Sequence, residues 1–481
     1  MRARRLALAI LATAAGLASA ARGNGAFPDE FSVNFVPGAP HRILIGANFG
    51  LLVSEDDGAT WRYSCEPYVT TGSSAALSSA NVGFYQVTAN GAILADAIQV
   101  TRSPDTGCSW PMSTGSVAPP VVVSDVFADP ADATVAWAIT ARANGSDVVA
   151  SHDGGQSFGA PLYSTSDLLT GVESSKSKAG VVYATLVAAA ATGSKLLRSA
   201  DAGATWTATA IANTNTLPRI LTVDPANENV VYLRLVDFPN DSILVTTNGG
   251  QTFGTALVAT GQLTSFLLAS DGALYAGTLD GHFYARPAGA AQFTQHAGPH
   301  LRCLGQRPGT ARIFACGDLN LDGFSLAYSD DAGQTFQKVM TFRDLLGPLA
   351  CPQVQAACAA HWSRIQQVLG IGGTGSPDAG STGGSKAGKS GCATGGTGGL
   401  GFLALALALT SRARRNWAFD NKKPASLRIR ARTCLVEHDG IEPSTSAMPF
   451  PNHRGVPGRL ALRSAPQERP YFGILATTMG T

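Results

Sequence analysis

Oxygen-bearing side chains alternate along one short segment in the C-terminal half of the chain. Asp318, Asn320 and Asp322 occupy its first, third and fifth places, and Gly323 follows at the sixth. Oxygen donors at alternate places before a turn glycine are what a calcium loop requires. The twelfth place holds Ser329 instead of a bidentate glutamate, so the competing interpretation is a polar hairpin that turns at Asp322–Gly323. Calcium is the one cofactor that these residues suggest.

A second set of carboxylates recurs in a fixed eight-residue setting. Each octet has Ser or Thr first, Asp or Asn third, Gly fifth, Ser or Thr seventh, and Trp or Phe last. The third residue of the successive copies is Asp56, Asp105, Asp153, Asp201, Asn248 and Asp331. Glycine supplies a positive φ and the carboxylate accepts backbone N–H groups, which is the chemistry of a turn. We therefore expect these six side chains to be structural.

The octets define a repeat. Successive copies lie 47–49 residues apart until a gap of 83 residues before the last copy, and an eroded copy at Ala285–Phe293 divides that gap. Seven units thus lie within residues 27–345. Each unit also carries β-branched runs, with turn signals such as Asp129–Pro130. Four short strands per unit are typical of a propeller blade. The expected fold is an all-β, seven-bladed β-propeller.

The octet resembles the Asp-box, or BNR repeat, of sialidases, sortilin-type receptors and related propellers. That resemblance implies that the octet aspartates lie on the rim, away from any catalytic mouth. The sialidase Arg-Ile-Pro signature is matched only by Arg42–Ile43, and no Tyr–Glu nucleophile pair stands out. Xyloglucanase-type propellers use two opposed aspartates, and the loop acids that remain as candidates are Asp125, Asp147, Asp237 and Asp241. A binding module is the favoured function, and a secreted glycoside hydrolase is the alternative.

Six cysteines are candidates for disulfides, and they are Cys65, Cys108, Cys303, Cys316, Cys351 and Cys358. None belongs to a CxxC pair with zinc-ligand spacing, so a zinc site is not expected. Short separations favour Cys303–Cys316 and Cys351–Cys358, which leaves Cys65–Cys108, although spacing alone does not determine the pairing. Residues 346–369 predict a short helical cap after the last blade, stapled by Cys351–Cys358.

Both ends of the chain carry segments that resemble protein-targeting signals. Residues 1–20 combine an arginine-rich start, a short apolar run and Ala18-Ser19-Ala20, which together predict a cleaved signal peptide and hence export. Beyond a Gly/Ser-rich linker at residues 370–391, residues 392–415 join Cys392 to a glycine-rich apolar stretch and an arginine cluster.

This last segment resembles the MYXO-CTERM sorting signal of myxobacterial surface proteins. The resemblance implies that Cys392 is the site of processing and attachment to the outer cell surface. A plain membrane anchor is the alternative, for which the apolar run is short. Residues 416–481 continue where such proteins normally end, and readthrough or a misplaced gene end explains this tail most simply.

The charge of the chain divides by segment. Residues 1–22 carry a net charge of +4, Arg412–Arg415 +3 and residues 416–481 +4, so residues 23–391 carry −9 within the total of +2. An acidic body excludes a nucleic-acid partner and a bare anionic membrane. The expected partner is a protein, peptide or glycan on a propeller face, with membrane contact only through the sorting segment.

Overall fold

The computed structural model describes residues 30–71, 84–96, 99–188, 193–211 and 216–371 of the 481-residue chain. The predicted signal peptide, the Gly/Ser linker, Cys392 with the sorting segment, and the tail lie outside these residues. Within the described part, neither α2 (Glu66–Thr71) nor α3 (Pro352–Leu369) combines the length and apolar character that a membrane-crossing helix needs.

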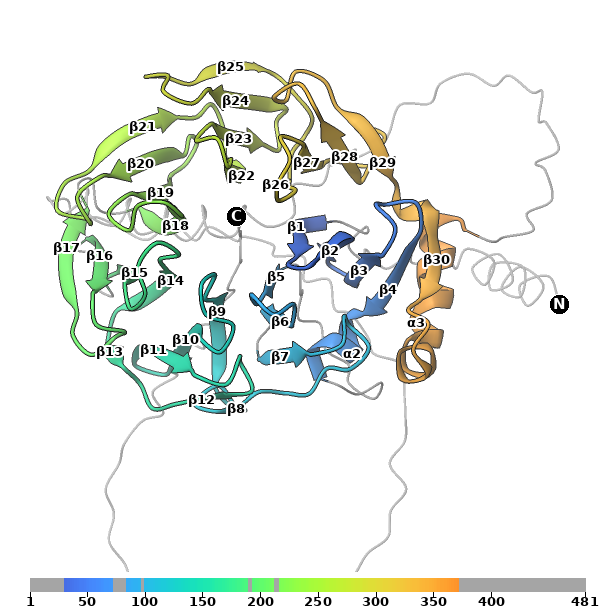
Figure 1. The fold of residues 1–481 in the computed structure, drawn as a ribbon, viewed down its shortest axis with the longest axis horizontal. Coiled ribbons are helices and arrows are strands. Elements are labelled where there is room, and N and C mark those ends of the chain that lie inside the picture. The colour runs from blue at the N-terminus through green and yellow to red at the C-terminus, as the bar shows by residue number, and fades with distance from the viewer. Residues whose placement is uncertain (1–29, 72–83, 97–98, 189–192, 212–215, 372–481) are drawn as a thin grey trace, which may run out of the picture. The chain divides into compact units, whose positions relative to one another are not determined.

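The described strands form a seven-bladed β-propeller, with one blade for each sequence unit (Figure 1). Blade 1 comprises β1 (Glu30–Val36), β2 (Ala39–Ala47), β3 (Gly50–Ser54) and β4 (Trp61–Cys65). Blade 2 comprises β5 (Phe84–Val87), β6 (Ile93–Asp96) and β7 (Val100–Ser103). Blade 3 comprises β9 (Val122–Ala128), β10 (Ala136–Arg142), β11 (Gly145–Ser151) and β13 (Tyr163–Thr165). A parallel pair, β8 (Thr114–Gly115) and β12 (Ser157–Phe158), joins blades 2 and 3.

The remaining blades have four antiparallel strands each. Blade 4 comprises β14 (Leu168–Ser174), β15 (Val182–Val187), β16 (Ser194–Ser199) and β17 (Thr207–Ile211). Blade 5 comprises β18 (Leu217–Val223), β19 (Val231–Val236), β20 (Ser242–Thr246) and β21 (Gly254–Val258). Blade 6 comprises β22 (Leu263–Leu268), β23 (Leu274–Thr278), β24 (His282–Arg286) and β25 (Thr294–Ala297). Blade 7 comprises β26 (Cys303–Gln306), β27 (Ile313–Cys316), β28 (Leu326–Ser329) and β29 (Gln337–Met340).

The core lies between adjacent blades. Strands β15 and β19 are rich in Val, Leu and Tyr and are almost continuously buried. Both faces of each strand are covered, because its blade lies between two neighbouring blades. Tyr183 and Leu196 of blade 4 pack with Val231 and Leu233 of blade 5 in one buried layer. Each such side chain contributes about 1.5–3 kcal/mol of burial free energy. The ring is therefore held by a series of apolar layers between neighbours.

The octets form the turns that follow the third strand of their blades. In blade 4, Asp201 Oδ1 accepts the Ser199 hydroxyl and the Thr205 N–H, both at 2.8 Å, and Oδ2 accepts the Thr205 hydroxyl at 2.6 Å. The same bonds recur at the octet positions Asp56, Asp105, Asp153 and Asp331. In blade 5, Asn248 Oδ1 accepts the Thr246 hydroxyl and the Thr252 N–H, and its Nδ2 donates to the Thr252 hydroxyl. These are turn contacts of the kind that the octet pattern predicts.

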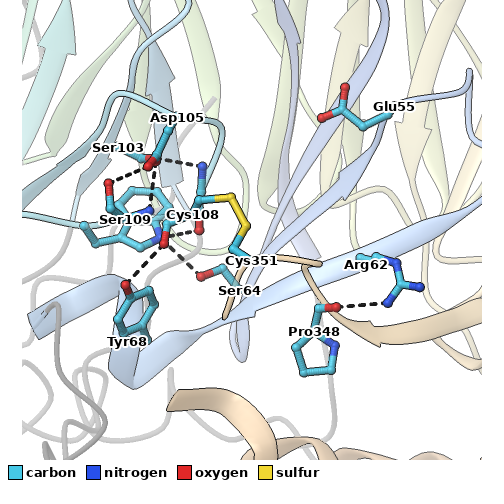
Figure 2. Close-up of a disulfide and its surroundings, with 12 residues drawn as sticks. Glu55, Arg62, Ser64, Tyr68, Ser103, Asp105, Cys108, Ser109, Pro348 and Cys351 are labelled. Carbon is cyan, nitrogen blue, oxygen red and sulfur yellow. Dashed lines mark hydrogen bonds between the residues drawn. A yellow bond between two sulfur atoms is a disulfide. The ribbon is translucent and has the colours of Figure 1, made fainter. Parts of the chain in front are cut away.

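The C-terminal segment of the propeller returns to the first two blades. After the turn η1 (Phe342–Asp344), β30 (Leu345–Pro348) pairs in parallel with β4, and α3 follows. Arg62 of β4 donates to the carbonyl oxygen of Pro348 at 3.1 Å (Figure 2). Figure 1 also places β26 of the last blade beside β1 of the first. The ring is thus closed by strands from both ends of the repeat array.

Disulfides secure this closure, in a pairing that differs from the expected one. Cys303–Cys316 is confirmed. The predicted bridges Cys351–Cys358 and Cys65–Cys108 are wrong, because Cys65 bonds to Cys358 and Cys108 bonds to Cys351, the disulfide that Figure 2 shows. The helix that begins at Pro352 packs against β4 of blade 1, β30 and α2, so Cys358 reaches Cys65 in blade 1 while Cys351, just before the helix, reaches Cys108 in the octet turn of blade 2. The helical cap itself is confirmed.

Candidate functional site

The inner strands of blades 1–5 enclose a central cavity of about 270 Å³. A cavity of this size suits one side chain or one small ring. The wall residues that carry the argument are Asn34 of β1, Phe84 and Gln86 of β5, Asp96 of β6, Asp125 and Phe127 of β9, Glu173 of β14 and Arg219 of β18.

Two acids of the wall each bind the inner strand of the next blade. Asp125 Oδ2 accepts the Val172 N–H at 2.8 Å, across blades 3 and 4. Glu173 Oε1 accepts the Val223 N–H at 2.9 Å, across blades 4 and 5. Asp96 of blade 2 lies close enough to Val126 in blade 3 for that backbone N–H to counteract the rise in its pKa. An inner strand has a free edge whose buried N–H groups need acceptors, and these carboxylates supply them.

One arginine shares the wall with the acids. Arg219 Nη1 donates to the carbonyl oxygen of Thr170 at 2.8 Å. Burial lowers the pKa of this guanidinium, and the charges of Asp125 and Asp96 work in the opposite direction. Arg234 in the next strand of blade 5 is paired with Asp241 at 2.6 Å, with both side chains buried.

Burial also changes the acids. It raises the pKa of Asp125 to about 6, an effect that the Val172 N–H and Arg219 oppose. It raises the pKa of Glu173 to about 7, opposed by the Val223 N–H. The pKa of Asp96 lies well above its usual range, first because of burial and then because of the negative charge of Asp125. The cavity therefore holds exchangeable protons near neutral pH, and it can bind polar or charged groups.

Of the four loop acids considered from the sequence, one lines the cavity. Asp125 does so. Asp147 pairs with Arg142 at 2.7 Å and accepts the Ser164 hydroxyl at 2.6 Å. Asp241 is paired with Arg234, and Asp237 lies beside it, donating its N–H to the Asp241 carboxylate at 2.9 Å. The opposed pair expected by analogy with xyloglucanases is not formed among these four.

Sequence reasoning missed Asp96 on the second strand of blade 2, and Glu173 and Arg219 on inner strands. Asp125 and Glu173 stand 48 residues apart, which is close to one repeat length. This spacing does not place them at the same level of their blades, because Glu173 pairs with Tyr183 as Phe127 pairs with Trp137 one blade earlier.

The predicted calcium segment forms a polar loop between β27 and β28. Asp318 Oδ1 accepts the N–H groups of Asn320 at 2.8 Å and Leu321 at 3.1 Å. Asp322 Oδ2 accepts the Asp318 N–H at 2.8 Å and the His300 N–H at 3.0 Å. Across the described ranges, no group of three or more His, Cys, Asp and Glu side chains is placed to hold a metal ion. The calcium hypothesis for Asp318, Asn320 and Asp322 stays a prediction.

Comparisons with known proteins leave the family open. No family model matches the chain, and no curated protein matches it. Among solved structures, YCF48 from Cyanidioschyzon merolae is 13% identical with a TM-score of 0.43, over 60% of this chain and 92% of that chain. The Dos1 propeller is 9% identical with a TM-score of 0.46, over 65% and 84%. The GH74 enzyme of Niastella koreensis is 13% identical with a TM-score of 0.38, over 66% of this chain and 46% of that chain. Similarity at this level carries no functional argument.

Proposed function

We propose that this chain is an exported binding module that takes a protein or peptide ligand at its central cavity. One observation carries the proposal: Asp125 and Glu173, which both line the cavity, each accept a backbone N–H from the next blade. Side chains held in this way form a pre-organised polar pocket. A carboxylate that acted as a nucleophile would first have to give up its hydrogen bond to the neighbouring strand.

Binding arrays test this function. Purified mature chain is applied to a peptide array and a glycan array, and each hit is repeated with Gln86→Leu. Gln86 lines the cavity and takes part in neither of the two carboxylate bonds between blades, so its loss changes the wall without loosening the blades. The matched control is Gln334→Leu on an exposed octet turn. We expect peptide hits that Gln86→Leu weakens and Gln334→Leu leaves intact. Hits that only rim substitutions abolish, or hits confined to glycans, contradict the proposal.

Export and surface attachment form the second part of the proposal. Three disulfides in the described residues are typical of a protein that matures in an oxidising compartment. Residues 1–20 supply the predicted signal peptide, and Cys392 supplies the predicted attachment site. Replacing Cys392 by Ala should release the protein into the medium, as measured by immunoblotting of cell and medium fractions. Cys434→Ala, in the tail, is the control, and surface display of Cys392→Ala would refute the attachment site.

A secreted glycoside hydrolase is the second candidate, favoured by one observation. Asp125 and Glu173 line the same cavity, and burial raises their pKa values to about 6 and about 7. Two carboxyl groups with raised pKa values are what acid–base cleavage of a glycoside uses. Release of reducing sugar from an oligosaccharide panel, abolished by Glu173→Gln, would establish this activity in place of simple binding.

A further inference from the structure

Resting on the proposed function, we infer that the central cavity takes an organic cation, namely the ammonium or guanidinium group of its ligand. Acids line the cavity from three strands, Asp96 on β6, Asp125 on β9 and Glu173 on β14. Arg219 on β18 is the basic residue of the same wall. When all four groups are ionised, two negative charges are left without a countercharge inside the cavity.

The neighbouring positive charge does not correct this imbalance. Arg234 of β19 lies next to Arg219 but is bound to Asp241 at 2.6 Å, in a separate buried ion pair. Buried charges that lack a countercharge are costly, and a cation that enters the cavity removes that cost. An anionic ligand would increase it. The charge balance therefore selects a cation.

The other wall groups suit an organic cation. Phe84 and Phe127 contribute aromatic rings to the lining, and a ring face attracts an ammonium or guanidinium group. Asn34 of β1 and Gln86 of β5 add amide groups whose oxygens accept N–H donors. The volume of about 270 Å³ admits a charged head group with several methylene groups. A lysine or arginine side chain projecting from a peptide has this shape and chemistry.

Entry of a cation also displaces protons. Asp96, Asp125 and Glu173 hold protons at mildly acidic pH because they are buried. A cation is stabilised by the ionised acids only, so binding releases protons and the affinity rises with pH. No other titratable side chain lines the cavity besides these acids and Arg219, within the residues that the structure describes.

Isothermal titration calorimetry tests the inference with defined small probes. N-acetyl-lysine amide and N-acetyl-arginine amide represent a peptide source, butylamine represents a free amine, and N-acetyl-norleucine amide is the neutral analogue. We expect both charged amino-acid probes to bind about tenfold or more tightly at about pH 8 than at about pH 5.5, with proton release visible as buffer-dependent heat. If butylamine binds as tightly as N-acetyl-lysine amide, the natural ligand is a free amine. If butylamine binds more weakly, the natural ligand is a peptide side chain.

A pair of charge-removing variants completes the test. Glu173→Gln keeps an oxygen that can accept the Val223 N–H but removes the negative charge. The affinity for N-acetyl-lysine amide should therefore fall about tenfold. Asp271→Asn is the control, because Asp271 is exposed and its Oδ1 likewise accepts a backbone N–H, from Ala273 at 2.9 Å. Norleucine amide binding as tightly as lysine amide, or heat with calcium chloride and none with the amines, overturns the inference. Neutral peptide hits that Gln86→Leu abolishes overturn it too, while leaving the proposed function intact.

Discussion

Buried acids and octet acids act in opposite directions on the pH dependence of stability. Burial raises the pKa of Glu173 and Glu66 to about 7 and of Asp125 to about 6. The native state therefore keeps protons that the unfolded chain, with carboxyl pKa values of about 4, has released. Stability falls as pH rises from about 4 to about 7. Hydrogen bonds from Thr335 lower the pKa of Asp331 to about 2, so the stability that this carboxylate gives the native state is lost as pH falls from about 4 to about 2.

We expect the melting temperature to be highest at about pH 4–5 and to fall by a few degrees towards about pH 8. Differential scanning calorimetry across this range measures it. Glu173→Gln should flatten the fall, since its amide has no proton to release, and Asp271→Asn should leave the fall unchanged. A melting temperature that climbs steadily from about pH 5 to about pH 8 would show that the buried acids are ionised in the native state.

The octet aspartates give a second prediction at the scale of one residue. Asp201→Ala removes the acceptor for the Thr205 N–H and hydroxyl and should lower the melting temperature by a few degrees. Cavity binding should be unaffected, because the turn lies at the far end of the blade's third strand. The natural Asn248 suggests the control: its Oδ1 accepts the Thr252 N–H and its Nδ2 donates to the Thr252 hydroxyl. Asp201→Asn should therefore retain most of the stability. Lost binding with unchanged melting would contradict a structural role.

The octet glycine belongs to the scale of the element, because it sets how closely neighbouring blades approach. Gly250 in blade 5 has φ of +91°, and a Cβ there would lie 2.8 Å from Leu196 Cδ2 of blade 4. Gly155 repeats the arrangement, with φ of +86° and Leu94 of blade 2 at 2.5 Å. A side chain is excluded both by the backbone conformation and by the neighbouring blade.

Gly250→Ala should accordingly cost about 1–3 kcal/mol of unfolding free energy, measured by urea denaturation. Gly254→Ala, four residues later, is a demanding control, because a Cβ at Gly254 meets nothing within 4 Å and its φ lies outside the left-handed region. Equal losses in the two variants would show that neither the positive φ nor the close approach of Leu196 explains the effect.

Local chemistry explains which elements the sequence predicts well. Each octet holds its turn bonds within eight contiguous residues, so the number and order of the blades follow from reading along the chain. The cavity depends on distant partners instead: Asp125 binds a residue 47 positions away, and Glu173 binds one 50 positions away. No spacing rule identifies such bonds before the blades are placed around a ring. The predicted pairing of Cys351 with Cys358 was wrong for the same reason, because it rested on proximity in sequence while the true partners are distant residues.

At the scale of the whole molecule, closure of the ring joins the two ends of the repeat array. Arg307 of blade 7 pairs with Asp57 of blade 1, which also contacts His41. The guanidinium of Arg307 lies 5.8 Å from the Phe35 ring centroid and 5.2 Å from that of Phe314, so the contact spans both blades. An ion pair that is still partly open to solvent contributes little on its own. The covalent links from α3 to blades 1 and 2 are the stronger constraint on closure.

The two long-range disulfides should therefore be non-additive by about 1–2 kcal/mol. Cys65–Cys358 and Cys108–Cys351 close paths of 293 and 243 residues, and a chain-entropy account assigns about 5 kcal/mol to a single crosslink of this length. While one bridge remains, the other closes a path of about 50 residues through 65–108 and 351–358, worth about 4 kcal/mol, so the two single losses should sum to less than the loss on removing both. Cys65→Ser/Cys358→Ser, Cys108→Ser/Cys351→Ser and the fourfold variant are compared by urea denaturation. Cys303→Ser/Cys316→Ser is the control, because its 13-residue path lies within blade 7 and does not close the ring. Additive losses would mean that blade packing alone closes the propeller and that each bridge acts locally.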